Sequence, residues 1–293
     1  MIWLVGCKGL LGREVADVLE RKQLQYIGTD IEVDITDSEV AKKFVAQQNG
    51  IDWIINCAGY TAVDKAEDEP EATEKLNVFG PRYLGMAAEE IGARIIHVST
   101  DYIFGSTGDS IDRPLEECDP AAPECVYGRT KLAGEFAIKK ATRRAFIIRT
   151  AWLYGTWGKN FVFSMLQLFK ERSMVKVVRD QIGCPTWSRV MAEFIAEIIE
   201  RNSDNYGVYH FCGRGQASWY EFSLEIARLA QELGIQKKRV LIEPCTSDEF
   251  ASRAKRPKWS VLSTVATEAA FGIKTKPWQE SLGKFMSMIN EQH

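Results

Sequence analysis

The architecture of this chain can be predicted from a stretch near its start, Gly6-Cys7-Lys8-Gly9-Leu10-Leu11-Gly12. The apolar residues 2–5 precede it and the helical pattern REVADVLERK follows it, so its glycines stand between a strand and a helix. At the spacing G-x-x-G-x-x-G they allow a tight turn in which backbone N–H groups and a helix N-terminus approach a pyrophosphate. The stretch predicts a dinucleotide-binding turn, with a plain glycine-rich turn as the alternative. The residues expected to contact the dinucleotide here are Gly6, Lys8, Gly9, Leu10, Leu11 and Gly12.

An acidic residue follows at the end of the second predicted strand, residues 24–30. Asp30 is placed to accept hydrogen bonds from the adenosine ribose, and its charge disfavours a 2′-phosphate. Lys8 is expected to approach the same phosphate and to offset that repulsion, so both kinds of dinucleotide are expected to bind. Asp37 is expected to cap the helix that begins after it. Further residues expected on the adenine side are Asp34 and Ile35.

Strand and helix patterns alternate through the first half of the chain. Predicted strands at 51–57, 94–104 and 144–155 alternate with predicted helices at 70–92 and 127–141. This order is typical of an α/β fold, a Rossmann-type doubly wound parallel sheet whose ligands bind at the carboxyl ends of the strands. The residues at those ends are Gly6, Ala58, Thr100 and Thr150. The residues expected to lie against the cofactor after the third strand are Cys57, Ala58, Gly59 and Tyr60.

Tyr127 and Lys131 are four residues apart at the start of a predicted helix, so their side chains point to one face. A nearby ammonium favours the phenolate and lowers the phenol pKa from its usual value of about 10. Such a phenol is a usable proton donor for an alcohol oxygen that forms at neutral pH. A solvated Tyr–Lys pair without a chemical role would match the same spacing. The glycine turn and the stretch Ser99-Thr100-Asp101 after an apolar run favour the catalytic interpretation.

Beyond residue 150 the pattern becomes irregular, which indicates a second, smaller α/β domain that covers the site. We expect a dinucleotide-binding domain at 1–155, to which the chain returns at about 174–212, and a carboxyl-terminal substrate domain at 156–173 and 213–293. Trp152, Trp219, Arg256 and Lys258 are candidates for stacking on a base and pairing with a diphosphate. Each of them, taken singly, is equally compatible with an ordinary core or surface position.

The composition excludes several classes of function. The chain has 293 residues, a formal net charge of −3 and a pI near 5.8, which give no electrostatic reason to bind a nucleic acid polymer. No apolar run reaches the ~18 residues of a membrane span, and we expect neither a membrane segment nor a signal peptide. Seven cysteines without CxxC spacing are typical of reduced thiols in a cytoplasmic protein. His97 is interpreted as a buried strand residue and not as a metal ligand.

Taken together, the motifs resemble those of the extended short-chain dehydrogenase/reductases and, within them, the dTDP-4-dehydrorhamnose reductase family. The resemblance covers nearly the whole chain and rests on GCKGLLG, INCAGYTAVDKAE, HVSTDYIFG, VYGRTKLAGE, RTAWLYG, DQIGCPT and AKRPKWSVL. It implies reduction of the C4 ketone of a nucleotide-linked 6-deoxy sugar by hydride from NADPH or NADH. By this resemblance Thr100 hydrogen-bonds the ketone oxygen and Tyr127 donates the proton. Lys131 lowers the pKa of Tyr127 and binds the nicotinamide ribose.

The resemblance also implies a substrate-binding set and bears on metal binding. The set comprises Thr100, Asp101, Tyr102, Trp152, Asn160, Asp180, Gln181, Thr186 and Arg256. Some members of the family dimerise through a magnesium ion held by glutamates, and Glu14 and Glu193 fall at matching positions. The stretch that matches the third glutamate reads KFMSMI, and a hard cation requires several oxygen ligands, so we expect no required metal. A monomer or a homodimer is expected.

Two alternatives stay open. The regulatory subunit of methionine adenosyltransferase shares this fold and much of this pattern while serving as a binding partner. The presence of Thr100, Tyr127 and Lys131 together with the full glycine turn favours an enzyme. Another nucleotide-sugar reductase or an epimerase would use the same residues. The segments DQIGCPT and AKRP favour the rhamnose type by resemblance only.

Overall fold

The computed structural model of the chain describes residues 1–250 and 252–291, and its centre is a six-stranded parallel sheet. Its strands are β1 (Ile2–Val5), β2 (Tyr26–Thr29), β3 (Trp53–Asn56), β4 (Arg94–Thr100), β5 (Ala145–Thr150) and β10 (Gly207–His210). They lie in the order β10-β5-β4-β3-β1-β2, so the winding changes direction between β1 and β3. In doubly wound sheets this switch point opens a crevice at the carboxyl ends of the strands. The predicted Rossmann-type architecture is confirmed.

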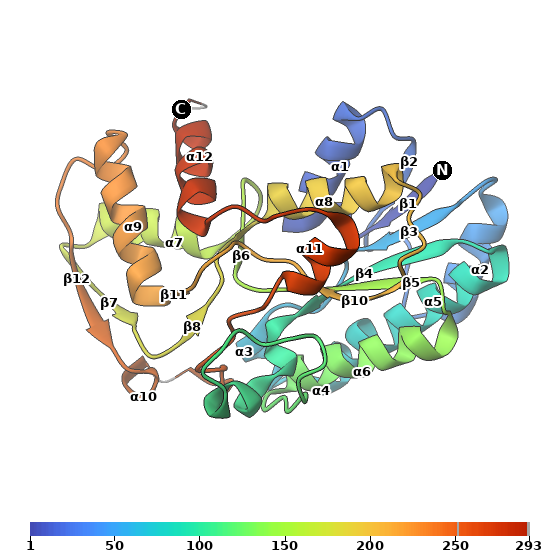
Figure 1. Ribbon diagram of the computed structural model, residues 1–293, viewed down its shortest axis with the longest axis horizontal. Helices are drawn as coiled ribbons and strands as arrows, with labels where there is room; N and C mark the ends of the chain where they lie inside the picture. Colours follow the sequence, from blue (N-terminus) through green and yellow to red (C-terminus); the bar gives the residue numbers. More distant parts are fainter. Residues whose placement is uncertain (251, 292–293) are drawn as a thin grey trace.

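Helices cover both faces of this sheet, as Figure 1 shows. One face carries α1 (Leu10–Arg21) and α8 (Ser188–Glu200), and the other carries α2 (Ser38–Gln47), α5 (Gly80–Ile91) and α6 (Val126–Ala141). The apolar sides of the helices form a core on each face: Val15 and Ile195 belong to the first core, and Leu84 and Ile138 to the second. Strands β1 and β5 are buried between these layers, which explains their continuous apolar runs, whereas the edge strands β2 and β10 are mostly half-buried.

Local sequence sets the ends of several elements. The Asp37 carboxylate accepts a hydrogen bond from the N–H of Glu39 at 2.8 Å, which confirms Asp37 as the N-cap of α2. Helix α5 ends at Gly92, whose φ of 75° is the left-handed conformation that glycine adopts without strain. Residues 70–92, expected as one helix, form α4 (Pro70–Glu74), a π-helical turn (Lys75–Phe79) and α5 in direct succession.

The second part of the molecule lies to the left of the sheet in Figure 1. It comprises α7 (Phe161–Glu171), α9 (Trp219–Glu232) and α12 (Trp278–Glu291), with β7 (Met174–Val178) paired to β12 (Leu241–Cys245) and β8 (Ile182–Gly183) paired to β11 (Ala217–Ser218). Phe222, Leu282 and Phe285 belong to its own apolar core. The shorter elements of the chain are α3 (Val63–Ala66), β6 (Leu153–Tyr154), β9 (Thr186–Trp187), α10 (Ser247–Phe250) and α11 (Val265–Phe271).

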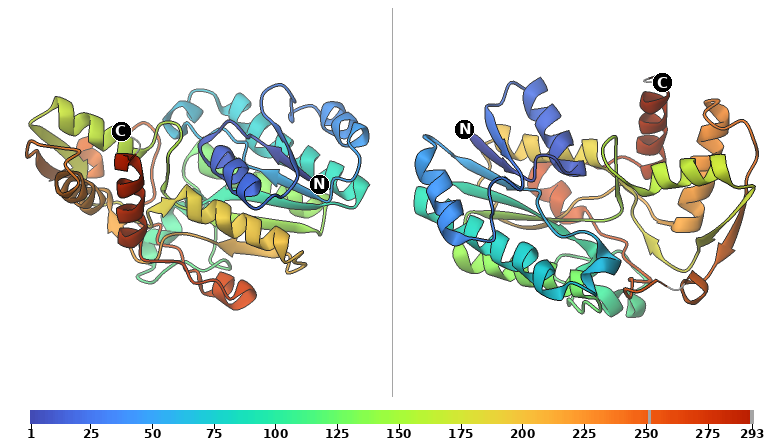
Figure 2. Two further views of the ribbon diagram at one scale, coloured as in Figure 1. Left: turned by 90° about the horizontal axis from the view of Figure 1, so that it is seen from above. Right: turned by 180° about the vertical axis from the view of Figure 1, so that it is seen from behind.

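The chain crosses between the two parts more than once, and both views in Figure 2 show them next to each other. In the expected return at about 174–212, α8 and β10 lie on the large sheet, whereas β7 pairs in parallel with β12 in the second part. In this position β7 has exposed residues at Met174 and Lys176, whereas β5 in the large sheet is buried throughout. Among the described residues, no helix combines the length and the apolar character needed to cross a bilayer.

Candidate active site

A cavity of about 1090 Å³ lies at the carboxyl ends of the parallel strands, between the two parts of the molecule. Residues predicted for the cofactor and for the substrate line it together. The predicted residues on its wall are Gly6, Lys8, Gly9, Leu10, Leu11, Asp30, Asp34, Ile35, Cys57, Ala58, Gly59, Thr100, Asp101, Tyr102, Tyr127, Lys131, Trp152 and Arg256. The sequence-based set therefore converges largely on one site.

The glycine turn has the geometry that a close approach to a ligand requires. Gly6 has a φ of 76°, a conformation that side-chain-bearing residues rarely adopt. A Cβ at Gly12 would lie 2.0 Å from the carbonyl oxygen of Gly6, so only glycine lets α1 pack this closely on the turn. Helix α1 has no side-chain hydrogen bond at its N-cap, Gly9, and no acidic residue in its first turn. The positive end of its dipole is thus available to an anion, and the turn fits a pyrophosphate.

Beyond the turn, the end of β2 fits an adenosine ribose. The Asp30 carboxylate accepts hydrogen bonds from the backbone N–H groups of Lys8 and Ile31, each at 3.0 Å. These two bonds fix the carboxylate at the cavity wall, where it can accept hydrogen bonds from hydroxyl groups. The Nζ atom of Lys8 lies 3.1 Å from Glu32 and forms an ion pair with it.

Thr100, Tyr127 and Lys131 line the cavity together, Thr100 from the end of β4 and the other two from the first turns of α6. All three are buried, with exposed fractions of 5%, 9% and 4%. The Thr100 hydroxyl donates to Asp101 Oδ1 at 3.0 Å and shares a hydrogen bond with Tyr127. The ring of Tyr102 packs edge-on against Tyr127, with centroids 5.3 Å apart. The geometry brings two hydroxyl groups to one point of the cavity wall.

Burial decides the protonation state of Tyr127. It raises the pKa of this phenol, and the hydrogen bond with Thr100 offsets the rise only in part. This direction is opposite to the lowering expected from the Tyr–Lys spacing. Lys131 Nζ donates instead to the carbonyl of Val98 at 2.5 Å and lies 3.4 Å from His97 Nε2. Tyr127 is therefore protonated at neutral pH, which is the state that a proton donor needs.

The Lys131 ammonium sits in a buried, polar setting. Burial lowers the pKa of Lys131 to about 8, although the charge of Glu135 one turn later opposes this shift. His97 is 1% exposed, as its interpretation as a buried strand residue predicts, and its Nδ1 lies 3.1 Å from Asn56 Nδ2. Burial and the Lys131 charge hold the pKa of His97 well below its usual range. A neutral imidazole thus packs beside Lys131, behind the residues that line the cavity.

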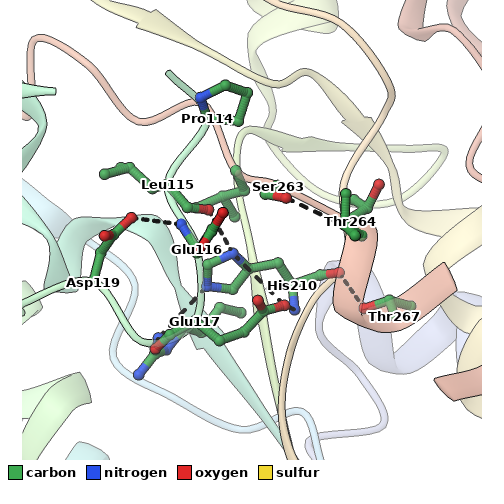
Figure 3. A network of polar contacts seen from close by, with 12 residues as sticks. Pro114, Leu115, Glu116, Glu117, Asp119, His210, Ser263, Thr264 and Thr267 are labelled. Carbon is green, nitrogen blue, oxygen red and sulfur yellow. Dashed lines mark hydrogen bonds and ion pairs between the residues drawn. The ribbon is translucent and has the colours of Figure 1, made fainter. Parts of the chain in front are cut away.

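A buried polar network lies behind these residues. Ser99 donates to Glu135 at 2.5 Å, and Arg149 donates to the second oxygen of the same carboxylate at 2.8 Å. Arg149 also donates to the carbonyl of Glu117 at 3.0 Å, and Glu117 accepts the N–H of His210 at 2.8 Å (Figure 3). Burial lowers the pKa of His210 to about 3, so this imidazole is neutral. The network joins β4, β5, β10 and α6 and fixes α6 against the sheet.

The substrate-side wall is built from both parts of the molecule. Trp152, which follows β5, stacks on Trp219 at the start of α9. Arg256 donates to Asp64 at 2.8 Å, and its other terminal nitrogen lies 3.4 Å from the Tyr102 hydroxyl. The guanidinium thus holds the segment around residue 256 against the loop after β3. It also lines the cavity, where an anionic group can reach it.

Some predicted site residues lie outside the cavity lining. They are Gly12, Tyr60, Asn160, Asp180, Gln181 and Thr186. Asn160 caps α7, and Asp180 and Gln181 both bond to Ser247, at 2.8 and 2.9 Å. Their observed contacts stabilise loops of the second part. For each of them, a contact with a ligand stays a prediction.

Other residues line the cavity without having been predicted. They are Val5, Ile31, Val33, Thr61, Val63, Leu76, Val98, Ala151, Leu153, Lys159 and Phe161. The signal for Ile31 is its position directly after Asp30, and it is 90% exposed. Lys159 stands directly before Asn160, which the resemblance already marks as a substrate-binding residue. The apolar ones carry no pattern that separates a cavity wall from a core.

Glu14 and Glu193, the two glutamates that match metal ligands of some family members, differ in burial. Glu14 is buried, and its carboxylate pairs with Arg189 at 2.6 Å. Glu193 is exposed on α8. Within the part of the chain that the structure describes, no group of three or more His, Cys, Asp and Glu side chains is arranged to hold a metal ion. The seven cysteines are free thiols.

A doubly wound sheet with a glycine turn at its first crossover, and with buried threonine, tyrosine and lysine side chains on one cavity wall, defines a nicotinamide-dependent oxidoreductase of the short-chain dehydrogenase/reductase class. Within that class, the chain belongs to the family described as "RmlD substrate binding domain", whose model matches residues 1–291.

Relatives of known description agree with this assignment. The dTDP-4-dehydrorhamnose reductase of Mycolicibacterium smegmatis is 38% identical over 283 residues, which cover 96% of this chain and 83% of the relative. The crystal structure of a dTDP-4-dehydrorhamnose reductase from Clostridium acetobutylicum is 39% identical and superposes with a TM-score of 0.91, covering 98% of this chain and 99% of that one. The Bacillus anthracis dTDP-4-dehydrorhamnose reductase, solved in complex with NADP, is 33% identical, with a TM-score of 0.90 and 98% coverage of both chains.

Proposed function

We propose that this chain reduces the C4 ketone of dTDP-4-dehydro-L-rhamnose to dTDP-L-rhamnose, with NADPH or NADH as the reductant. The observation that carries the proposal is the convergence of Thr100, Tyr127 and Lys131 on the same cavity as the glycine turn. The identity of the relatives as dTDP-4-dehydrorhamnose reductases supports this sugar, because the cavity alone defines only a ketone or alcohol reaction.

The residues present fit a nicotinamide dinucleotide. Gly9, Leu10 and Leu11 would bind its pyrophosphate through the start of α1, and Asp30 would accept hydrogen bonds from its adenosine ribose. Lys131 would bind the nicotinamide ribose. When bound, the dinucleotide supplies the hydride that reduces the carbonyl carbon.

The chain's own residues manage the charge on the ketone oxygen. As the carbonyl carbon is reduced, negative charge develops on this oxygen, and donors placed at it stabilise the transition state. Tyr127 gives its proton to the oxygen and becomes a phenolate. The Thr100 hydroxyl, which otherwise donates to Asp101, would turn to the ketone oxygen as the second donor. The Lys131 ammonium stabilises the phenolate until solvent protons restore the phenol.

The nucleotide half of the substrate would bind on the other wall. Trp152 and Trp219 offer an apolar aromatic surface, and the Arg256 guanidinium offers two parallel donors to diphosphate oxygens. In this arrangement the catalytic residues belong to the dinucleotide-binding domain at 1–155. The specificity residues come largely from the carboxyl-terminal segment at 213–293.

A non-catalytic role of the methionine adenosyltransferase regulatory type is the alternative from another class. It requires no proton donor at the cavity, so the buried placement of Tyr127 and Thr100 would have no purpose in it. An epimerase remains the closest catalytic alternative: a UDP-glucose 4-epimerase from Thermotoga maritima shares the fold with a TM-score of 0.81 at 17% identity. That degree of likeness speaks for the fold alone.

The test is an assay with purified chain, dTDP-4-dehydro-L-rhamnose and reduced nicotinamide, with both the cofactor absorbance and the sugar product measured. We expect stoichiometric loss of the absorbance and a dTDP-sugar whose mass has increased by two hydrogens. Formation of an isomer of the substrate without cofactor consumption would identify an epimerase. Cofactor binding without either reaction would favour the non-catalytic alternative.

The remaining proposals concern cell compartment and assembly. We propose that the enzyme is cytoplasmic, which is supported by its free cysteines. A monomer or a homodimer is proposed, since one chain supplies both the cofactor side and the substrate side of the cavity.

A further inference from the structure

Glu32 stands between Ile31 and Val33, two residues that line the cavity beyond Asp30, and the mechanism above does not use it. One oxygen of its carboxylate accepts the backbone N–H of Asp30 at 2.9 Å, and the other lies 3.1 Å from Lys8 Nζ. A bond from the N–H of Val33 to the carbonyl of Asp30, at 3.1 Å, closes the same turn. Glu32 is therefore folded back beside Asp30 and does not extend into solvent.

Two carboxylates and one ammonium meet at this point. The hydrogen bond and charge of Glu32 raise the pKa of Lys8. The backbone N–H of Glu32 itself, and then Lys8, lower the pKa of Glu32. At neutral pH the three side chains together carry a net charge of about −1. Arg13, another cation on this turn, donates to the carbonyl of Lys8 at 3.0 Å.

We propose that Glu32 makes this enzyme prefer NADH to NADPH. The inference rests on the proposed function, which places the adenosine ribose at Asp30. A 2′-phosphate there would meet the charges of Asp30 and Glu32, while the ammonium of Lys8, which could offset them, is held by Glu32. An unphosphorylated ribose presents two hydroxyls, and the fixed Asp30 carboxylate accepts hydrogen bonds from them.

The exposure of Lys8 and Glu32 limits how strongly the enzyme can prefer NADH to NADPH. The side chains of Lys8 and Glu32 are 60% and 49% exposed, so water and salt screen their interactions. We therefore expect NADH to bind about tenfold more tightly than NADPH at low salt, with the difference shrinking as salt is added. NADPH is still accepted, in keeping with the use of both cofactors expected from the sequence.

The test measures dissociation constants of NADH and NADPH, from nicotinamide fluorescence, for the wild type and for Glu32→Gln. The variant keeps the shape of the side chain but removes its charge and releases Lys8. We expect NADPH to bind about tenfold more tightly to the variant and NADH to change by less than about twofold. An unchanged ratio, or an equal gain for both cofactors, would overturn the assignment.

Two further variants sharpen the result. Glu39→Gln removes the same charge from an exposed site seven residues away, on the first turn of α2, and it should leave the ratio unchanged because the ion pair of Lys8 with Glu32 stays intact. The double variant Lys8→Met with Glu32→Gln should lose most of the increase in NADPH affinity, because that increase depends on the released ammonium. An increase that persists in the double variant would contradict the role of Lys8.

The same measurements separate the inference from the proposed function. Failure of every variant and of the wild type to bind either cofactor would refute both. Binding of both cofactors with an unchanged ratio of affinities would refute only the inference.

Discussion

The indole rings of Trp152 and Trp219 stack face to face, with centroids 3.5 Å apart and planes 5° from parallel. This contact joins the chain after β5 to the first residue of α9. Trp152 has a φ of 48°, a left-handed conformation that costs a bulky residue roughly 1–3 kcal/mol and persists only where its surroundings enforce it. Gly183 provides the space, since a Cβ there would lie 2.6 Å from the Trp152 ring.

Gly183→Ala is therefore expected to displace the Trp152 ring from its stack. We expect KM for the sugar nucleotide to rise about tenfold or more, because the aromatic wall contacts the substrate in ground and transition states alike. The dissociation constant for NADH should stay within about twofold of the wild type. Gly283→Ala, where a Cβ would meet no atom within 4 Å, is the matched control. An unchanged KM in Gly183→Ala would exclude the stack from the substrate wall.

Arg256→Ala tests the diphosphate contact. Loss of the guanidinium should raise KM for the sugar nucleotide by about 10–100-fold, with a smaller loss of kcat and little change in cofactor affinity. Arg253→Ala is the control, because Arg253 also makes an ion pair with the region after β3, through Asp68, but does not line the cavity. Equal weakening of cofactor and substrate binding would show that Arg256 acts by holding the fold together.

Asp101 predicts a pH dependence of stability. Burial raises the pKa of this carboxyl to about 6, and its Oδ2 lacks a hydrogen-bond partner. Because the unfolded pKa is about 3.9, the folded chain holds a proton that the unfolded chain releases between about pH 4 and pH 6. This contribution to stability is complete below about pH 4 and is lost as the pH rises through about 6.

The Asp101→Asn variant has no such proton to lose. Its free energy of unfolding relative to the wild type should therefore improve by about 3 kcal/mol between pH 4 and pH 7, at about 1.4 kcal/mol per pKa unit. Denaturant titrations across this range measure the difference. Asp204→Asn, at an exposed position, should run parallel to the wild type. Parallel curves for Asp101→Asn as well would disprove the shifted pKa.

The parts of the site that could be predicted from the sequence are those whose position follows from local backbone geometry. The glycine turn, the strand ends and the four-residue Tyr127–Lys131 spacing follow from local geometry, and all of them reach the cavity wall. The direction of the Tyr127 pKa did not follow, because it depends on burial and on Lys131 facing the Val98 carbonyl. Both are properties of tertiary packing that spacing along one helix does not reveal.

In the second part of the molecule, too, the tertiary contacts could not be predicted from the local sequence. The pattern of β7 indicates a strand, but only its pairing with β12, more than sixty residues later, determines which sheet it joins. Asp180 and Gln181 stand in a motif that the resemblance marks as substrate-binding, yet both bond to Ser247. The sequence pattern does not single out Glu32, because its contact with Lys8 joins two loops that only the fold brings together.

Lys131→Met separates two roles of one residue. Loss of the ammonium should reduce kcat by about 10²-fold or more, because the phenolate left on Tyr127 loses its stabilising charge. It should also weaken NADH binding several-fold, because the ribose contact is lost. Lys140→Met, an exposed lysine on the same helix, is the control and should alter neither value. Normal cofactor affinity in Lys131→Met would limit the residue to its effect on Tyr127.

In the proposed mechanism Tyr127 donates the proton to the ketone oxygen. This role is tested by the single-turnover rate of Tyr127→Phe at saturating dTDP-4-dehydro-L-rhamnose and NADH, with the NADH dissociation constant determined on the same sample. Tyr154→Phe, which removes a buried hydroxyl outside the cavity, serves as the control. Because the variant lacks the proton donor, we expect its rate to be about 10²–10⁴-fold below that of the wild type, with cofactor affinity nearly unchanged. A wild-type rate in Tyr127→Phe would contradict this role.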